Sequence, residues 1–167
     1  FDMFKLLPFI LEAEAAKNAI GHFNIGNLEQ LKAISHVARR LNLPVIIGLS
    51  EGERDYFGVE HVRDFIQSYN KEHGVSGGFI LFLNADHTHS LEKVKDAAEA
   101  GFDAILFDGG KLSFAENIKQ TREAVKIAKA IKPDILVEGE LGFIGASSEI
   151  LKEIPKDAAI KPGDLTK

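Results

Sequence analysis

Residues 79–90 read Phe-Ile-Leu-Phe-Leu-Asn-Ala-Asp-His-Thr-His-Ser, an apolar run that ends on polar and ionisable side chains. The apolar part, Phe79 to Leu83, is too short for a helix and consists of Phe, Ile and Leu, so it predicts a buried strand. Ser90 is in the right place to cap a helix that begins directly afterwards. A strand followed at once by a helix is the repeating unit of a parallel α/β sheet.

The same alternation continues in both directions along the chain. Continuous apolar strands separated by amphipathic helices indicate a parallel sheet that is covered on both faces. Asn27, Ser90 and Ser113 are predicted helix caps, and Pro133 ends the last helix. The other predicted strands cover residues 19–25, 44–49, 104–107 and 135–137, and the predicted helices cover 3–17, 28–41, 59–69, 91–98 and 118–131.

Two architectures fit this order, an open doubly wound sheet and a (β/α)8 barrel. A dinucleotide-binding sheet is disfavoured, because the turn after the first strand, residues 24–29, contains one glycine instead of G-x-G-x-x-G. A complete barrel needs about 250 residues. We therefore expect residues 1–167 to form the N-terminal part of a single barrel domain, an incomplete barrel with about five βα units. Residues 142–167 are predicted to be a long loop or the start of the next unit, and the chain, which begins with Phe1, is predicted to be a fragment of a longer protein.

The composition excludes several classes of function. The chain has 167 residues and a formal net charge of −5, which argues against binding to nucleic acid or to an anionic membrane surface. It has no cysteine, so any metal must be bound by His, Asp or Glu. No apolar run approaches the roughly 18 residues needed to cross a bilayer. These features predict a soluble, cytoplasmic protein.

Each predicted strand ends at polar or ionisable side chains. In barrels and open α/β sheets alike, ligands bind at the carboxyl ends of the strands. Several carboxylates and a histidine at one end of a sheet predict a site that is centred on a cation. The residues at these ends are Asn24, Ser50, Asp86 with His87, Asp108, and Glu138 with Glu140.

The adjacent pair Asp86 and His87 is the most informative of these. Strand alternation would place the two side chains on opposite sides, so we expect different roles: the imidazole as a metal ligand and the carboxylate as a proton donor. Alternatively, His87 bonds a backbone carbonyl and Asp86 caps a helix. Asp108 could likewise serve only to start a helix. Glu138 and Glu140 share one face of a strand, so a cation should lie near them.

The remaining histidines are weaker candidates for a site. His89 could be a spare ligand, but we expect an exposed residue at a helix start. His22, in the first strand, is predicted to pack in the core with one hydrogen bond. Three further histidines are predicted to be solvated on helices or at a helix end, namely His36, His61 and His73.

Taken together, these residues resemble the N-terminal portion of the class II, metal-dependent fructose-bisphosphate aldolases and the related tagatose-bisphosphate enzymes. The resemblance covers nearly the whole chain. It is carried by six segments in the same order, residues 22–29, 44–52, 86–87, 100–109, 114–121 and 137–142.

The resemblance implies a (β/α)8 barrel with a Zn²⁺ ion held by three histidines. In that family the ion polarises the ketone of dihydroxyacetone phosphate and stabilises its enediolate. Carried over by position, His87 is the first zinc ligand. Asp108 and Glu140 match carboxylates linked to a second metal or to a monovalent cation near the substrate. The other two zinc histidines and the phosphate-binding loops belong to the family's second half.

The resemblance also implies the residues that act on the substrate. Asp86 would be the acid that protonates the aldehyde oxygen, and Asn24 and Ser50 would line the substrate pocket. Glu149, offset by one residue, is the nearest candidate for the base that takes a proton from dihydroxyacetone phosphate.

The activity implied is that of a lyase of carbohydrate metabolism, such as glycolysis, which cleaves a ketose bisphosphate reversibly into dihydroxyacetone phosphate and an aldehyde. The substrate would be a phosphosugar, fructose or tagatose bisphosphate, and the full-length protein a homo-oligomer. Residues 1–167 alone are expected to be inactive. Two alternatives stay open: a truncated, non-catalytic half-barrel, whose sheet edges would be exposed, and a metal-free sugar-phosphate isomerase, which would pair a glutamate base with a neutral histidine.

Overall fold

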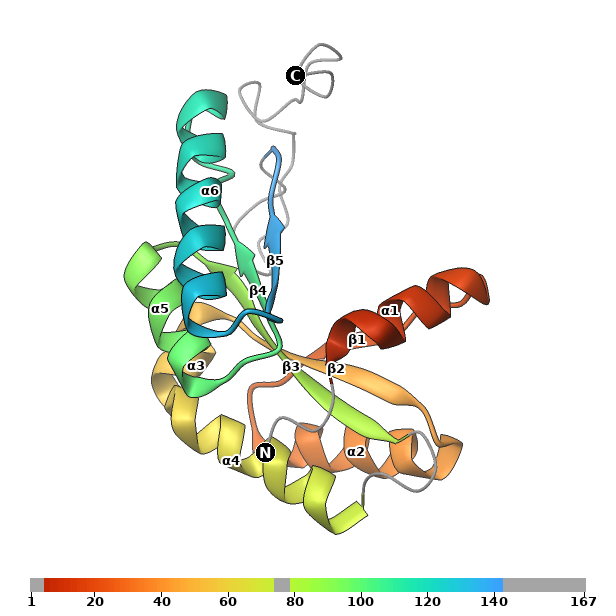
Figure 1. Cartoon of the computed structure of the whole chain (residues 1–167). Helices are drawn as coiled ribbons and strands as arrows, with labels where there is room; N and C mark the ends of the chain where they lie inside the picture. Colours follow the sequence, from red (N-terminus) through yellow and green to blue (C-terminus); the bar gives the residue numbers. More distant parts are fainter. Residues whose placement is uncertain (1–4, 74–78, 143–167) are drawn as a thin grey trace, which may run out of the picture.

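A computed structural model of the chain describes residues 5–73 and 79–142. Within them, helices and strands alternate as the sequence pattern predicts (Figure 1). The elements are α1 (Leu6–Ala15), β1 (Gly21–Asn24), α2 (Leu28–Leu41), β2 (Pro44–Leu49), α3 (Glu51–Phe57), α4 (Val59–His73), β3 (Ile80–Thr88), α5 (Leu91–Ala100), β4 (Ala104–Phe107), α6 (Phe114–Ile131) and β5 (Leu136–Gly139).

The five strands form one parallel sheet in the order β1-β2-β3-β4-β5. Each crossover therefore moves the chain one strand further in the same direction. A doubly wound sheet instead reverses direction at a switch point, where the strand order changes. The described strands thus have the arrangement of a partial (β/α) barrel, which confirms the predicted fold class and excludes a doubly wound order for these five strands.

Side-chain caps set the start of three helices. The side chains of Asn27, Ser90 and Ser113 accept hydrogen bonds from backbone N–H groups three residues further along. Each bond satisfies an N–H group that the helix itself leaves without a partner. At the other end, α5 terminates at Gly101, whose φ of 86° lies in the left-handed region that favours glycine. The three predicted caps are confirmed.

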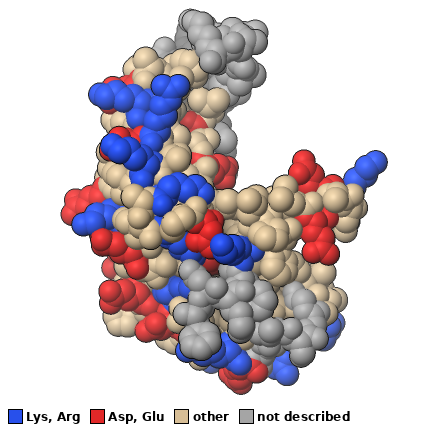
Figure 2. All heavy atoms as spheres, viewed as in Figure 1, with Lys and Arg blue, Asp and Glu red and all other residues tan. Residues whose placement is uncertain are grey.

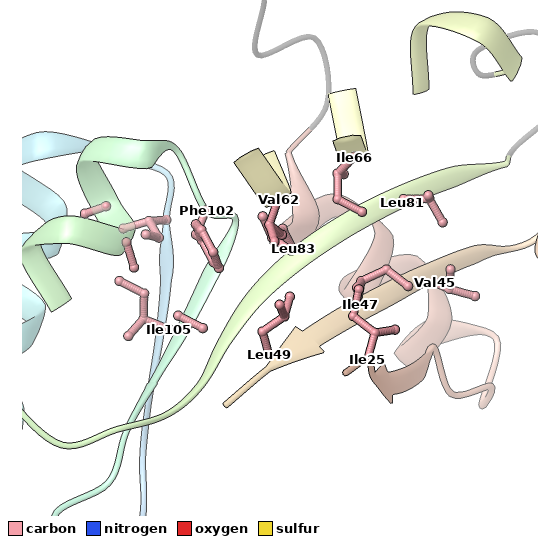
Figure 3. Close-up of a cluster of buried hydrophobic side chains, with 14 of the residues drawn as sticks. Ile25, Val45, Ile47, Leu49, Val62, Ile66, Leu81, Leu83, Phe102 and Ile105 are labelled. Atoms are coloured by element: carbon pink, nitrogen blue, oxygen red, sulfur yellow. The ribbon is translucent and has the colours of Figure 1, made fainter. Parts of the chain in front are cut away.

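The larger core lies between the sheet and the helices α2, α4, α5 and α6. Ile47, Leu83 and Ile105, from three neighbouring strands, have no exposed surface. Val62 and Ile66 of α4 cover this face of the strands (Figure 3). Burial of each such side chain stabilises the fold by about 1.5–3 kcal/mol relative to exposure, so these contacts hold the strand ends in a fixed frame.

The opposite face of the sheet is apolar near the start of the strands and polar near their carboxyl ends. Leu6 and Phe9 of α1 cover Ile80 and Phe82, and the rings of Phe9 and Phe82 meet edge to face at 5.1 Å. Helix α1 therefore lies on the side of the sheet away from α4, α5 and α6 (Figure 1). Further along the same face of β3 come Asn84 and Asp86, which are both buried.

Gly48 of β2 belongs to the polar part of this face. It pairs with Asn24 on one side and with Asn84 on the other. A Cβ atom there would lie 2.6 Å from Oδ1 of Asn24 and would also clash with Nε2 of His22. Only glycine leaves room for these side chains to lie across β2.

Strand β3 and helix α3 differ most from the prediction. Strand β3 continues to Thr88 instead of ending at Leu83, because the polar residues that follow the apolar run still pair with β2 and β4. Helix α3 was not predicted, since residues 51–57 have no apolar stripe; a bond from the N–H of Ser50 to Glu53 Oε2, at 2.7 Å, fixes its start. Strand β1 covers residues 21–24, within the predicted 19–25, and residues 143–167 lie outside the described part.

Charged side chains of both signs lie among uncharged ones on the face shown in Figure 2. On the face shown in Figure 2, basic and acidic residues are interspersed over α5 and α6. Among the described residues, no helix combines the length and the apolar character that crossing a bilayer requires.

Truncation of a core side chain tests this packing. We expect Leu83→Ala to lower the free energy of unfolding by about 2–5 kcal/mol, because it removes buried methyl groups and leaves a cavity. Leu41→Ala is the control, since Leu41 is 57% exposed, and should change the same quantity by no more than about 0.5 kcal/mol. Urea unfolding followed by circular dichroism measures both, and equal effects would contradict the described core.

Candidate functional site

Three ionisable side chains meet where β3, β4 and β5 end. His87 is the penultimate residue of β3, while Asp108 and Glu140 directly follow β4 and β5. Each offers one ligand atom, and these three atoms all lie within 4.8 Å of one another. Asp108 comes 21 residues after His87 and 32 residues before Glu140. The three residues meet because β3, β4 and β5 are neighbours in the sheet. We refer to these three residues as the carboxylate–histidine cluster.

His87 is at the centre of the cluster. Its Nδ1 lies 3.0 Å from Oδ2 of Asp108 and 3.3 Å from Oε2 of Glu140. The imidazole is 45% exposed, whereas the carboxylates are 15% and 12% exposed. The two carboxylates are therefore mostly buried, and the imidazole is the most exposed side chain of the cluster.

A β-bulge places Asp86 and His87 at this end of the sheet. Ala85 pairs with Ile105 and Thr88 with Phe107, so three steps along β3 match two steps along β4. His87 has φ of 43°, in the left-handed region, which costs a non-glycine residue about 1–2 kcal/mol. Such strain is typical of functional sites.

The bulge changes the consequence of strand alternation. The adjacent side chains have different partners: Oδ2 of Asp86 accepts a bond from Nδ2 of Asn24 at 2.7 Å, and His87 contacts Asp108 and Glu140. However, both lie at the same end of the sheet, and the charge of Asp86 is felt by His87 and by Glu140. The charges of the four predicted site residues therefore influence one another; these residues are Asp86, His87, Asp108 and Glu140.

Hydrogen bonds hold the carboxylate of Asp108 and the backbone of Glu140 in place. The N–H of Gly110 donates to Oδ1 of Asp108 at 2.9 Å, which leaves Oδ2 for His87. Asp108 thus accepts a turn N–H group, as the alternative interpretation expects, but it also contacts His87, so this turn is not its only contact. The backbone of Glu140 is held by Asn117 of α6, whose Nδ2 donates to the carbonyl oxygen of Glu140 at 2.7 Å.

Asn117 was not identified from the sequence as a site residue. It is 5% exposed and lies on the buried side of α6, where a polar residue among apolar neighbours is the available signal. A Cβ atom on Gly109 would lie 2.5 Å from Cγ of Asn117, so the loop after β4 approaches this side chain closely.

The ionisable groups of the cluster perturb one another. Burial of the Glu140 carboxyl, together with the nearby charge of Asp108, raises its pKa. The Asp108 pKa is lowered, because bonds from Gly110 N–H and from His87 outweigh the effect of burial. For His87, burial opposes protonation, but the bond to Asp108 and the surrounding carboxylates outweigh it and raise the pKa above 6.5. The cluster thus favours positive charge at its centre.

One oxygen of the cluster has no hydrogen-bond partner among the described residues. This atom is Oε2 of the Glu140 carboxyl group, and it is buried. The single hydrogen on Nδ1 of His87 can point to only one of its two acidic neighbours, and the bond goes to Asp108. A buried, unsatisfied carboxylate oxygen is costly, and a divalent cation would satisfy it. The nitrogen and two oxygens fit the donor set that Zn²⁺ accepts.

The other predicted site residues lie around the cluster or outside the described part. The backbone N–H of Ser50 starts α3, at the end of β2. His89 is half-exposed at the start of α5, as predicted, but its Nδ1 is also 3.6 Å from Oδ2 of Asp108. Glu149 lies outside the described residues.

The prediction for His22 was wrong with respect to burial. His22 is exposed, and its Nε2 lies 3.4 Å from Nδ2 of Asn84. Its ring lies on the polar face, next to Gly48 and Asn84. His36 and His61 are exposed, as predicted, while the side chain of His73 is outside the described part.

An apolar groove of about 720 Å³ lies at the opposite end of β1 and β2. It is lined by α1, α2 and the first residues of both strands, including Phe9, Val37 and Leu41. It contains none of the cluster residues, so the chemistry and this groove are at different ends of the sheet.

Comparisons with known proteins identify relatives of this arrangement. The family model described as fructose-bisphosphate aldolase class-II matches residues 5–164. A 6-phospho-5-dehydro-2-deoxy-D-gluconate aldolase of Shouchella clausii is 35% identical over 145 residues, which are 86% of this chain and 48% of that protein. A fructose-bisphosphate aldolase of Geobacillus stearothermophilus is 36% identical over 139 residues, 83% of this chain and 47% of that protein.

A solved structure shows the same similarity in three dimensions. The crystal structure of the YdjI aldolase of Escherichia coli K12 superposes with a TM-score of 0.71 at 28% identity, over 83% of this chain and 50% of that one. The chain thus spans about half the length of the relatives that it matches.

The ion pair at the centre of the cluster can be tested by NMR. In the metal-free chain we expect the His87 imidazole to titrate above pH 6.5, and Asp108→Asn to lower this pKa by removing the bonded carboxylate. Glu123→Gln is the control, because Glu123 is an exposed acid on α6 that pairs with Lys126. A pKa of His87 at or below 6.5 in the unsubstituted chain would contradict the contact.

The same ion pair predicts a pH-dependent contribution to stability. Because the pKa of folded His87 is raised, protonation stabilises the folded state below the unfolded pKa, and this stabilisation is lost as pH rises through the folded pKa. Urea unfolding of the metal-free chain should therefore show a larger loss for Asp108→Asn at about pH 5–6 than at about pH 8. An equal loss at both values would mean that His87 is not the partner.

Proposed function

The chain belongs to the class II fructose-bisphosphate aldolase family, and from this premise we propose that it supplies one half of the active site of a metal-dependent aldolase. The reaction is the reversible cleavage of a ketose bisphosphate into dihydroxyacetone phosphate and an aldehyde. The family match and the aldolase names of the relatives support the reaction class. The two relatives act on different substrates at nearly equal identity to this chain, so identity alone does not select the sugar.

The observation that carries this proposal is the convergence of His87, Asp108 and Glu140. Two carboxylates and an imidazole gather there, and one buried oxygen lacks a hydrogen-bond partner within the described residues. Burial of the Glu140 carboxyl and repulsion from the nearby charge of Asp108 raise its pKa. A cation at the cluster would relieve both costs.

The residues present fit a divalent cation. His87 would bind Zn²⁺, with Asp108 and Glu140 beside it as further ligands or as the site of a second metal or monovalent cation. When bound, the ion supplies Lewis-acid polarisation of the substrate's ketone oxygen. The family resemblance assigns two more histidines to the half of the barrel beyond this chain. We therefore expect residues 1–167 alone to bind metal weakly and to be inactive.

Asp86 is the proposed acid and base of the carbon–carbon bond step. In condensation, its protonated carboxyl gives its proton to the aldehyde oxygen as the new bond forms, and in cleavage its carboxylate takes that proton back from the hydroxyl. The amide of Asn24 holds Oδ2 of Asp86 at 2.7 Å, so Oδ1 is left for the substrate. Asp86 is 8% exposed, which limits competition from water.

The remaining roles follow the family resemblance. Asn24 and Ser50 would line the substrate pocket at the ends of β1 and β2. Glu149 would be the base that removes a proton from dihydroxyacetone phosphate. We also propose a cytoplasmic, homo-oligomeric full-length protein.

The cluster argues against the metal-free isomerase. That chemistry requires a neutral histidine that donates a hydrogen bond to the substrate. Here two carboxylates face His87 and raise its pKa, so the metal-free imidazole is held in its charged form at neutral pH more than a free histidine is. The two carboxylates favour positive charge beside the imidazole, and a bound cation would supply that charge without protonation of the ring.

Substitution of Asp86 tests the proposed chemistry. We expect Asp86→Asn, in the full polypeptide that carries residues 1–167, to lower kcat for aldol cleavage by about 10²- to 10⁴-fold, because the amide cannot transfer the proton. The control is Asp64→Asn on α4, which leaves the strand ends unchanged. A coupled assay for dihydroxyacetone phosphate measures the rate. Undiminished activity of Asp86→Asn, or of the wild type after exhaustive chelation, would overturn the proposal.

Metal binding can be measured independently of turnover. Titration with Zn²⁺ in a calorimeter should show that His87→Ala weakens binding at least tenfold, because one of the protein ligands is lost. His61→Ala provides the matched control, since His61 is an exposed histidine on α4. If the two variants bind Zn²⁺ equally well, His87 is not a ligand.

A further inference from the structure

Arg54 is a buried cation that lies directly beneath the site and that neither the sequence analysis nor the proposed mechanism uses. It belongs to α3, yet its side chain is 2% exposed and is one of the largest fully buried side chains of the described part. A charged group is seldom buried to this extent unless its hydrogen bonds are satisfied. The partners of Arg54 therefore indicate what the burial achieves.

The guanidinium of Arg54 bonds the strand ends on both sides of the bulge. Its Nη1 donates to the carbonyl oxygen of Leu49, at the end of β2, and to the carbonyl oxygen of Asp86, at 2.8 Å. Its Nη2 donates to Oγ1 of Thr88 at 2.9 Å. The planar fork of one side chain thus connects β2 with the residues immediately before and after His87.

The bulge needs such support, because the ordinary sheet bonds are interrupted there. The register between β3 and β4 shifts between Ala85 and Thr88, and His87 has a left-handed φ. Oγ1 of Thr88 also donates to the carbonyl oxygen of Ala85 at 3.2 Å, which closes the loop of the bulge. Thr88 is fully buried, so this network is shielded from water.

We propose that Arg54 is a positioning residue that holds the β3 bulge, and through it the side chains of Asp86 and His87, in the geometry that the site requires. The inference rests on the proposed function for the roles of those two residues. Arg54 acts through the backbone of Asp86 and the hydroxyl of Thr88, and it does not touch the substrate. Lysine could not replace it fully, since one ammonium cannot span the same three acceptors in fixed planar geometry.

The test compares Arg54→Met and Arg54→Lys in the full polypeptide that carries residues 1–167. We expect Arg54→Met to lower kcat by about 10- to 100-fold, to leave KM within about threefold, and to weaken Zn²⁺ binding by about 10- to 100-fold. Arg54→Lys should lie between Arg54→Met and the wild type. With Co²⁺ as a probe, the visible absorption band should shift in Arg54→Met, because the position of His87 changes.

Lys93→Met is the matched control. Lys93, on α5, is also a cation. It pairs with Asp55, which lies on α3 as Arg54 does, and it is outside the hydrogen-bond network of the bulge. Both kcat and Zn²⁺ affinity should stay within twofold of the wild type. A merely structural role for Arg54 would lower the melting temperature but, below that temperature, would leave the Co²⁺ spectrum and the Zn²⁺ affinity of the folded molecules unchanged.

Thr88→Val decides the matter if Arg54→Met does not fold. Valine has nearly the shape of threonine but removes the acceptor of Nη2, so kcat and Zn²⁺ affinity should each fall about 3- to 10-fold. The proposal is overturned if Arg54→Met folds, or Thr88→Val does, with both quantities within twofold of the wild type.

Failure of the proposed function would be seen separately, as a wild type without aldol cleavage. The Zn²⁺ and Co²⁺ measurements would then still test Arg54. If the wild type also bound no metal, amide exchange at Asp108 would decide, because its N–H donates to the carbonyl oxygen of Thr88 at 2.9 Å. Faster exchange in Arg54→Met supports the role, and unchanged exchange overturns it.

Discussion

The extra residue in β3 is the feature on which the geometry of the site depends. Between Ala85 and Thr88 the strand advances three residues while β4 advances two. Without this step, alternation would turn Asp86 and His87 to opposite faces of the sheet. With the bulge, Asp86 contacts Asn24 and His87 contacts the neighbouring carboxylates. Both side chains then lie at the same end of the sheet. The bulge persists because a buried hydrogen-bond network surrounds it.

Electrostatic repulsion is the second constraint. Parallel strands in sequential order place Asp108 and Glu140 on neighbouring strand ends, where each lies within 3.3 Å of His87. Two partly buried carboxylates that lie so close to the same side chain repel each other. They destabilise the folded state unless positive charge lies between them. The protonated imidazole supplies part of that charge in the metal-free chain, and a divalent cation would supply more. The same residues that favour cation binding thus give the fold a dependence on pH.

Much of the fold and part of the site could be predicted from local pattern. The apolar runs 44–49 and 104–107 coincide with β2 and β4, because their side chains pack on both faces of the sheet, as continuous apolar runs predict. The strand-end residues were found because parallel strands direct their carboxyl ends to one rim. Burial of His22 was predicted wrongly, since a position in a strand does not say whether another element covers that face. Helix α3 was not predicted for a related reason. Its sequence is mostly charged, and the side chain that it buries, Arg54, is itself charged.

The sequence by itself determined the alternation of strands and helices, the helix caps and the kinds of chemical group at the strand ends. These properties depend on periodicity and on contacts between residues that are close in the chain. Only the tertiary structure decided that β3 contains a bulge, that Arg54 lies beneath it, and that Asn117 holds the backbone of Glu140. Those contacts join residues 23 to 34 positions apart. Their geometry results from the packing of whole elements, which no local pattern encodes.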